Sequence, residues 1–261
     1  MNERVAIVDL DGTVYRGGTL IDGAADGLAR LREAGYTIRY VSNSPTSKPA
    51  DYAMRLQALG LDVDPSQVRS AGSVTTASLA DRHLDDDIFL IGSDGLRSQF
   101  HEAGLAVTED PETAGVLVAS WDPTFGYKDM MDALHLDDPA FYGTDPDTTF
   151  PNETGDIAPG SGAIIAAVES VLGREPDQIF GKPDRAMLEA ALEGTDATGE
   201  DCLVVGDRVS TDIALGERIG ATTVLVQTGV DSERELADCD IHPDHVINDL
   251  SAIEGVLSPK V

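Results

Sequence analysis

Residues Val5 to Tyr15, with the sequence VAIVDLDGTVY, constrain the fold more than any other stretch of the chain. The apolar run Val5–Val8 predicts a strand that is buried on both faces, as in a parallel sheet. Asp9 and Asp11 come at the end of this strand, and side chains two residues apart in an extended segment point to the same side. Two adjacent carboxylates repel each other, and a hard cation such as Mg²⁺ would hold them together. A solvated Asp-rich turn explains the same motif equally well.

The rest of the chain alternates between predicted strands and helices, which is typical of parallel α/β folds. The elements at about residues 75–179 form a set of their own, so we expect them to be a second domain inserted between residues 1–74 and 180–261. Apolar and β-branched runs predict strands at residues 37–41, 88–91, 115–120, 141–143, 202–206, 222–226 and 245–247. Helical spacing predicts helices that end near residues 34 and 59, and others at 95–103, 127–135, 160–172, 178–192 and 212–220.

The composition is strongly acidic, with 47 Asp and Glu against 18 Lys and Arg and a net charge of -29. Such a charge repels nucleic acids and anionic lipids, and no run approaches the roughly 18 apolar residues of a membrane span. We therefore expect neither a nucleic-acid nor a membrane partner. The N-terminus leads into a strand without a signal-peptide pattern, which predicts a cytoplasmic protein. Only four basic residues are lysines, so the surface resembles that of halophilic proteins, with an acidic mesophilic protein as the alternative. Cys202 and Cys239 have no metal-ligand spacing and predict no disulfide framework.

Polar side chains follow other predicted strands as well. Ser42 and Asn43 come directly after the second strand, Lys182 stands near the start of a predicted helix, and Asp207 follows the strand at residues 202–206, with Asp212 five residues further on. Ligands of parallel α/β folds bind at the carboxyl ends of the strands. We therefore expect these side chains to gather at one edge of the sheet with the first two acids.

These residue types suit phosphoryl transfer. A carboxylate such as Asp9 can be a nucleophile that forms an aspartyl-phosphate, and Asp11 can protonate the leaving oxygen and then activate water. Mg²⁺ would neutralise charge, while hydroxyl, amide and lysine groups would bind the phosphoryl oxygens. Each group alone has a simpler explanation, because Lys182 suits a solvated helix start and Ser42 or Asp212 suits a helix cap.

Taken in order, the four motifs resemble those of the haloacid dehalogenase-like phosphatase superfamily. Motif one is DLDGTV at residues 9–14, motif two contains Ser42, motif three contains Lys182, and motif four is Gly206-Asp207 with Asp212. The chain is most similar to the group of NagD and 4-nitrophenylphosphatase. That likeness rests on DGTVY at residues 11–15, SNSPTS at 42–47 and GKP at 181–183. Three sequence segments of the expected cap, at residues 122–127, 145–151 and 159–162, also match. The resemblance implies an α/β fold with a Rossmann-like parallel-sheet core and an inserted α/β cap of the C2 type.

The resemblance also implies a role for each matching residue. Asp9 would be the nucleophile and a Mg²⁺ ligand, and Asp11 the general acid and base whose backbone carbonyl also binds Mg²⁺. The third Mg²⁺ ligand would be Asp207, with Asp212 as an outer carboxylate that positions the site. The substrate phosphate would be bound by Ser42, the backbone of Asn43, and Lys182.

We therefore expect a Mg²⁺-dependent phosphomonoester hydrolase that acts on a small metabolite, such as a sugar phosphate, a nucleoside monophosphate or phosphoglycolate. The alternatives on the same fold are a non-catalytic phosphometabolite-binding protein and a phosphotransferase. Ser44 and Asp145 differ from the Asn that relatives often have at these positions, which suggests a shift in substrate preference. A large cap would restrict the site to small-molecule substrates. Relatives pair through the cap, so a homodimer is a further expectation.

Overall fold

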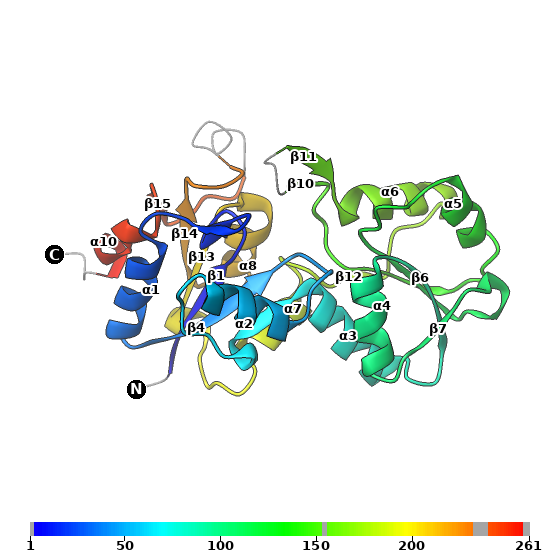
Figure 1. The fold of residues 1–261 in the computed structure, drawn as a ribbon, viewed down its shortest axis with the longest axis horizontal. Helices are drawn as coiled ribbons and strands as arrows, with labels where there is room; N and C mark the ends of the chain where they lie inside the picture. The colour runs from blue at the N-terminus through cyan, green and yellow to red at the C-terminus, as the bar shows by residue number, and fades with distance from the viewer. Residues whose placement is uncertain (1–2, 153–155, 232–239, 258–261) are drawn as a thin grey trace. The chain divides into compact units, whose positions relative to one another are not determined.

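The computed structural model describes residues 3–152, 156–231 and 240–257 (Figure 1). Within these ranges no helix is long and apolar enough to cross a membrane. The chain divides into two units, each with its own sheet. The first unit consists of Met1–Ser42, Tyr52–Arg69 and Leu188–Val261, and the second unit consists of Asn43–Asp51 and Ser70–Met187.

The first unit is built on a six-stranded sheet in which β1 (Arg4–Asp9) is an inner strand. β1 pairs in parallel with β13 (Cys202–Gly206) on one side and with β4 (Tyr36–Ser42) on the other. All four residues from Val5 to Val8 are fully buried, which confirms the prediction of a strand that is covered on both faces. The sheet order is β15-β14-β13-β1-β4-β5, with β14 at Thr222–Val226, β15 at His245–Ile247 and β5 at Val68–Ser70.

The register of these strands explains which residues meet at the edge of the sheet. Asp9 lies opposite Val41, so the residue that follows, Ser42, ends β4 at the same level. Val8 lies opposite Val205, which brings Asp207 just past the same edge. β14 is also parallel to β13, so its carboxyl end reaches this edge too. The expectation that polar side chains after separate strands share one edge is confirmed for the strands of the first unit.

Helices pack on this sheet because their apolar sides match its buried surface. Helix α1 (Ala24–Glu33) buries Leu28 and Leu31 in the same apolar cluster as Val8 of β1, and it contacts β4. A short helix, α8 (Ala214–Glu217), contacts β13 and β14. The chain also contains α2 at Pro49–Ala58, α7 at Arg185–Leu192 and α10 at Glu254–Leu257.

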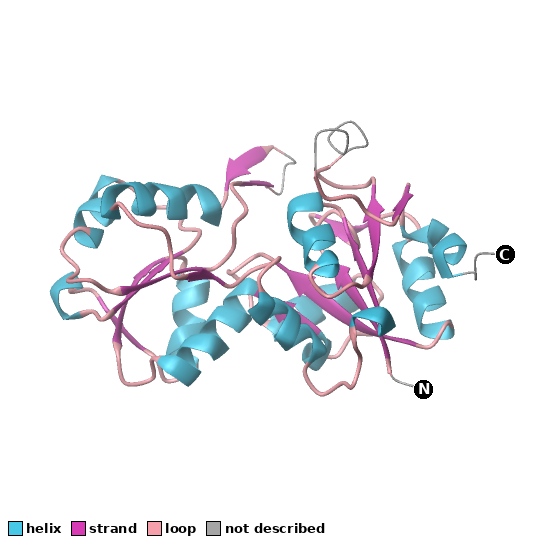
Figure 2. Cartoon of the chain, turned by 180° about the vertical axis from the view of Figure 1, so that it is seen from behind, coloured by secondary structure: helices cyan, strands magenta, loops and turns pink. Residues whose placement is uncertain are grey.

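The second unit contains a five-stranded sheet with the order β12-β9-β8-β6-β7. Every pairing in it is parallel. Helices lie on both sides of this sheet (Figure 2), and Phe141, Ile165 and Val168 belong to its apolar cluster. The strands are β6 at Asp87–Ile91, β7 at Ala106–Thr108, β8 at Val116–Ala119, β9 at Ala140–Gly143 and β12 at Gln178–Ile179. The helices are α3 at Ala71–Arg82, α4 at Asp94–Glu102, α5 at Tyr127–Ala133 and α6 at Ser161–Leu172.

Each unit also contains a two-stranded antiparallel pair. In the first unit β2 (Tyr15–Arg16) pairs with β3 (Thr19–Leu20), and in the second unit β10 (Thr149–Pro151) pairs with β11 (Ile157–Pro159).

Two predicted helices are wrong in part. The stretch from residue 178 is not helical at first: Gln178 and Ile179 form β12 beside β9, and α7 begins only at Arg185. The helix predicted at residues 212–220 is a π-helical turn at Val209–Ile213 followed by the short α8. Helix α3 was not predicted. Cys202 is buried, as a packing residue should be, whereas Cys239 lies outside the described residues.

Candidate active site

The first part of the site is the tight turn after β1. Asp9 ends the strand and is buried, with 6% of its surface exposed. The carbonyl of Leu10 accepts hydrogen bonds from the N–H groups of Val14 (2.9 Å) and Tyr15 (3.1 Å), which folds the chain back at once. Gly12 has a φ of 89°, a conformation that glycine adopts without strain. The chain therefore turns sharply at this glycine.

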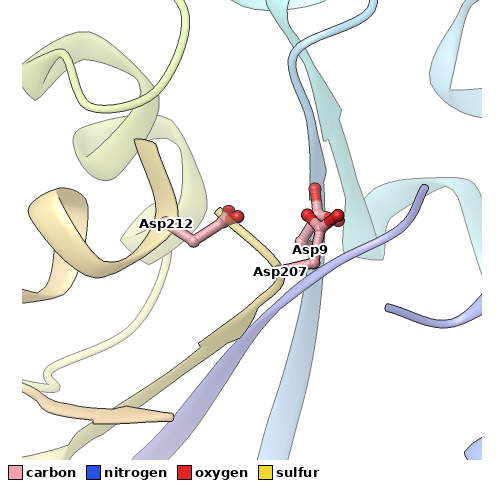
Figure 3. A group of neighbouring side chains, drawn as sticks. All are labelled: Asp9, Asp207 and Asp212. Carbon is pink, nitrogen blue, oxygen red and sulfur yellow. The ribbon is translucent and has the colours of Figure 1, made fainter. Parts of the chain in front are cut away.

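Three buried carboxylates converge beside this turn. Asp9, Asp207 and Asp212 each offer an oxygen, and these atoms lie within 4.8 Å of one another. Figure 3 shows the Asp212 carboxylate pointing toward the other two. This approach needs a glycine at position 206, because a Cβ there would lie 2.1 Å from Cγ of Asp212. From the sequence, Asp9 and Asp207 are predicted as metal ligands and Asp212 as an outer carboxylate that positions the site, and the structure brings all three together.

The chemistry of this group fits a hard divalent cation. Like charges at such distances repel strongly in a buried site. Carboxylate oxygens are the ligands that Mg²⁺ prefers in proteins, and a cation among them would remove the repulsion. The side chain of Asp11 is exposed and does not belong to the group. This is compatible with the backbone contact that the family resemblance assigns to it, which stays a prediction.

A loop that the sequence analysis did not single out holds Asp207 in place. This 227–231 loop follows β14 and runs along the same edge. The N–H of Val230 donates to Oδ2 of Asp207 (2.8 Å), and the N–H of Asp231 donates to its backbone carbonyl (3.1 Å). Oγ1 of Thr228 donates to the carbonyl of Gly12 (2.6 Å) and so joins the loop to the turn after β1. The sequence signal that could have identified this loop is its position directly after β14, a strand parallel to β13 and β1.

Asp212 is also held by its own chain segment. The N–H of Arg208 donates to Oδ2 of Asp212 (3.1 Å), and the N–H of Asp212 donates to the carbonyl of Arg208 (2.9 Å). Asp212 lies within the π-helical turn rather than before a helix, so it is not an N-cap of the kind considered from the sequence. A π-helical turn is rare and occurs often at functional sites.

Two tyrosines contact Asp11 and Ser42, and an arginine contacts one of these tyrosines. The hydroxyl of Tyr15 donates to Oδ2 of Asp11 (3.1 Å), and the hydroxyl of Tyr52 lies 3.3 Å from Oγ of Ser42. Arg55 Nη1 donates to the Tyr15 hydroxyl (3.4 Å). Burial, with a smaller contribution from the Asp11 charge, raises the pKa of Tyr15 far above its ordinary value, so this hydroxyl keeps its proton.

Asn43 and Lys182 belong to the second unit, where the Asn43 side chain binds the backbone of Lys182 at two points. Oδ1 of Asn43 accepts from the Lys182 N–H (2.7 Å), and its Nδ2 donates to the Lys182 carbonyl (3.3 Å). Lys182 is only 2% exposed, which is not the solvated helix start considered as its simpler explanation. The sequence predicted the Asn43 backbone as a phosphate ligand and did not predict this use of its side chain.

Asp145 is buried next to the same segment. A Cβ on Gly181 would lie 2.7 Å from the Asp145 Cβ, and Oγ1 of Thr144 donates to Oδ2 of Asp145 (3.0 Å). Burial, with a further contribution from the nearby charge of Asp147, raises the pKa of Asp145 to about 8. Asp145 therefore ionises in a pH range where an ordinary carboxyl is already charged.

The fold and the site together define an α/β protein with a cation-compatible acidic cluster at the carboxyl edge of its parallel sheet. A family described as haloacid dehalogenase-like hydrolase matches residues 6–106, and a second, described as HAD-hydrolase-like, matches residues 179–253. The chain is 33% identical to an acid sugar phosphatase of Staphylococcus haemolyticus over 252 residues, which cover 96% of this chain and 95% of that protein.

Solved structures give the same result. A p-nitrophenyl phosphatase from Archaeoglobus fulgidus matches with a TM-score of 0.87 and 31% identity, over 98% of this chain and 100% of that one. NagD from E. coli matches with a TM-score of 0.83 and 26% identity, over 96% and 98% of the two chains. The chain belongs to the haloacid dehalogenase-like hydrolase family. The predicted likeness to the NagD and 4-nitrophenylphosphatase group is confirmed, as is the predicted α/β fold class.

Proposed function

We propose that this protein is a Mg²⁺-dependent phosphomonoesterase that uses Asp9 as its nucleophile. The observation that carries the proposal is the cluster of three buried carboxylates at the end of β1, within a family of hydrolases. Burying three acids together costs free energy unless a cation or a specific function compensates. A structural role in packing gives no such compensation.

In the proposed reaction, an oxygen of Asp9 attacks the phosphorus atom and the P–O bond of the ester breaks. The leaving oxygen takes the electron pair of that bond and a proton from Asp11. In the second step Asp11 takes a proton from water, whose oxygen attacks phosphorus, and this returns Asp9 and releases inorganic phosphate. The carboxylates of Asp9 and Asp207 and the carbonyl of Asp11 would hold Mg²⁺, with Asp212 behind them. Mg²⁺ supplies neutralisation of the phosphoryl charge when it is bound.

We assign the phosphoryl oxygens to Ser42, the Asn43 N–H and Lys182. The two hydrogen bonds between the Asn43 side chain and the Lys182 backbone support this assignment, because they hold the backbone from which the lysine side chain extends. Groups that are already ordered before the substrate binds lose less entropy when charge develops in the transition state.

The substrate that we propose is a small sugar phosphate, and the support is the acid sugar phosphatase to which the chain is similar along most of its length. Nucleoside monophosphates and phosphoglycolate are the competing substrates. We further propose that residues 1–74 and 180–261 form the catalytic core and residues 75–179 a cap that restricts access to small esters. The cytoplasmic location and a dimer that pairs through the cap stay predictions.

The test is phosphate release from a panel of sugar, nucleoside and aryl phosphates at molar KCl, with and without Mg²⁺. We expect Mg²⁺-dependent turnover that Asp9→Asn abolishes while the protein stays folded, with a melting temperature in the absence of Mg²⁺ that is no lower than that of wild type, because one repelling charge is removed. Asp81→Asn, on the exposed side of α3, is the matched control and should behave as wild type. Activity in Asp9→Asn would contradict the choice of nucleophile. Tight binding without turnover would indicate a binding protein, and phosphoryl transfer to added glycerol would indicate a phosphotransferase.

A further inference from the structure

Tyr15 is placed to control the orientation of Asp11. Its hydroxyl donates to Oδ2 of Asp11 (3.1 Å), while Asp11 itself is exposed and Tyr15 is fully buried. The turn fixes this pairing, because the N–H of Gly12 donates to the Tyr15 carbonyl (2.9 Å) and Asp11 forms a β-bridge with Tyr15. Loss of this hydrogen bond would remove one restraint on the rotamer of the Asp11 side chain.

Arg55 determines the direction of the Tyr15 hydroxyl. A guanidinium group can only donate hydrogen bonds, so the Tyr15 oxygen accepts from Arg55 Nη1 (3.4 Å) and its own proton points to Asp11. The Arg55 guanidinium also lies 5.6 Å from the centre of the Tyr15 ring and 5.7 Å from that of Tyr52. At these distances the cation–π attraction stabilises the arginine beside both rings.

We propose that Tyr15 is a positioning residue for the general acid, which directs the Asp11 carboxyl to the leaving oxygen with help from Arg55. This inference rests on the proposed function, since it assigns Asp11 the proton transfer in ester cleavage. Tyr15 is fully buried and therefore does not touch a substrate. Its effect reaches the reaction only through Asp11.

The rate effect of a displaced Asp11 carboxyl depends on the leaving group. When the P–O bond breaks, a sugar alkoxide needs the proton of Asp11, whereas 4-nitrophenolate is stable without it. A displaced general acid should therefore slow the cleavage of alkyl esters much more than that of aryl esters. The quantity to compare is kcat/KM, because it reports the steps up to the first irreversible bond cleavage.

The experiment measures kcat/KM of wild type and Tyr15→Phe for a sugar phosphate and for 4-nitrophenyl phosphate. General acid catalysis contributes about 10²–10⁴-fold in enzymes, so we expect Tyr15→Phe to lose about 10–100-fold on the sugar phosphate and only a few-fold on the aryl ester. Arg55→Met should change the same ratio in the same direction by a smaller factor. Because Arg55 is exposed, this second variant tests the inference even if Tyr15→Phe does not fold.

Tyr40→Phe is the matched control. Tyr40 is also fully buried and also accepts from an arginine, Arg32 Nη2 (3.1 Å), but its place in β4 is opposite Val8 of β1. It should have a comparable stability cost and an unchanged ratio of the two kcat/KM values. Equal losses on both esters in Tyr15→Phe, or no loss, would overturn the inference. A wild-type protein that cleaves neither ester refutes the proposed phosphatase function instead.

Discussion

Adding one methyl group at Gly229 should disable the carboxylate cluster. A Cβ built on Gly229 would lie 1.6 Å from Oδ2 of Asp207 and 2.2 Å from its Cγ. Non-bonded atoms in contact are about 3.5 Å apart, so Gly229→Ala forces the carboxylate or the 227–231 loop to move by roughly 2 Å. Functional metal sites hold ligand distances within about 0.2 Å.

We expect this displacement to affect function more than stability. Overpacking costs about 1–3 kcal/mol of unfolding free energy, and the hydrogen bond from Val230 to Asp207 would be lost or lengthened. A misplacement of about 1 Å at a reacting centre can cost 10²-fold in rate, so kcat/KM should fall by at least about that factor. The concentration of Mg²⁺ that gives half-maximal activity should rise, because Asp207 would no longer be in place.

The assay is phosphate release against Mg²⁺ concentration, together with the melting temperature with and without Mg²⁺. Ligand binding to the folded state raises the melting temperature, so the wild type should gain stability from Mg²⁺ and Gly229→Ala should gain less. Gly115→Ala is the control, because a Cβ there meets no atom within 4 Å. If Gly229→Ala keeps the wild-type kcat/KM and Mg²⁺ dependence, Asp207 does not depend on this close contact for its role and our reasoning is wrong.

Two further predictions concern stability. The pKa of Asp145 is about 8 in the folded protein and about 3.9 when unfolded. Between these pH values the folded state keeps a proton on Asp145 that the unfolded state has lost. The free energy of unfolding therefore decreases as pH rises through this range, by at most about 1.4 kcal/mol per pH unit. Asp145→Asn removes this loss, and its melting temperature relative to wild type should increase from pH 5 to pH 8; a difference that is constant with pH would contradict the assignment. The net charge of -29 should make the protein a halophilic one whose melting temperature rises by several degrees from about 0.1 M to 1 M KCl, where the screening length falls from about 10 Å to 3 Å. A lower melting temperature in molar KCl would favour an acidic mesophilic protein.

Local patterns were sufficient for most of the first unit. The run Val5–Val8 has no polar residue, which suits a strand covered on both faces, and β1 is such a strand. Asp9 and Gly12 follow directly, and the left-handed φ of Gly12 needs a residue without a side chain. These features depend on contacts between residues that are near in sequence or on the simple rule that parallel strands end at one edge.

The other groups that complete the site come together only through long-range contacts of the folded chain. Asp207 is held by Val230, 23 residues away, and Asn43 binds Lys182 across 139 residues, so no periodicity in the sequence reports either contact. The same holds for β12, because Gln178 and Ile179 become a strand through pairing with β9 rather than through their own propensity. The local sequence pattern was enough to predict the strand ends and the acids on them. The long-range hydrogen bonds that fix those acids exist only once the strands have come together, and for that physical reason the structure was needed to identify them.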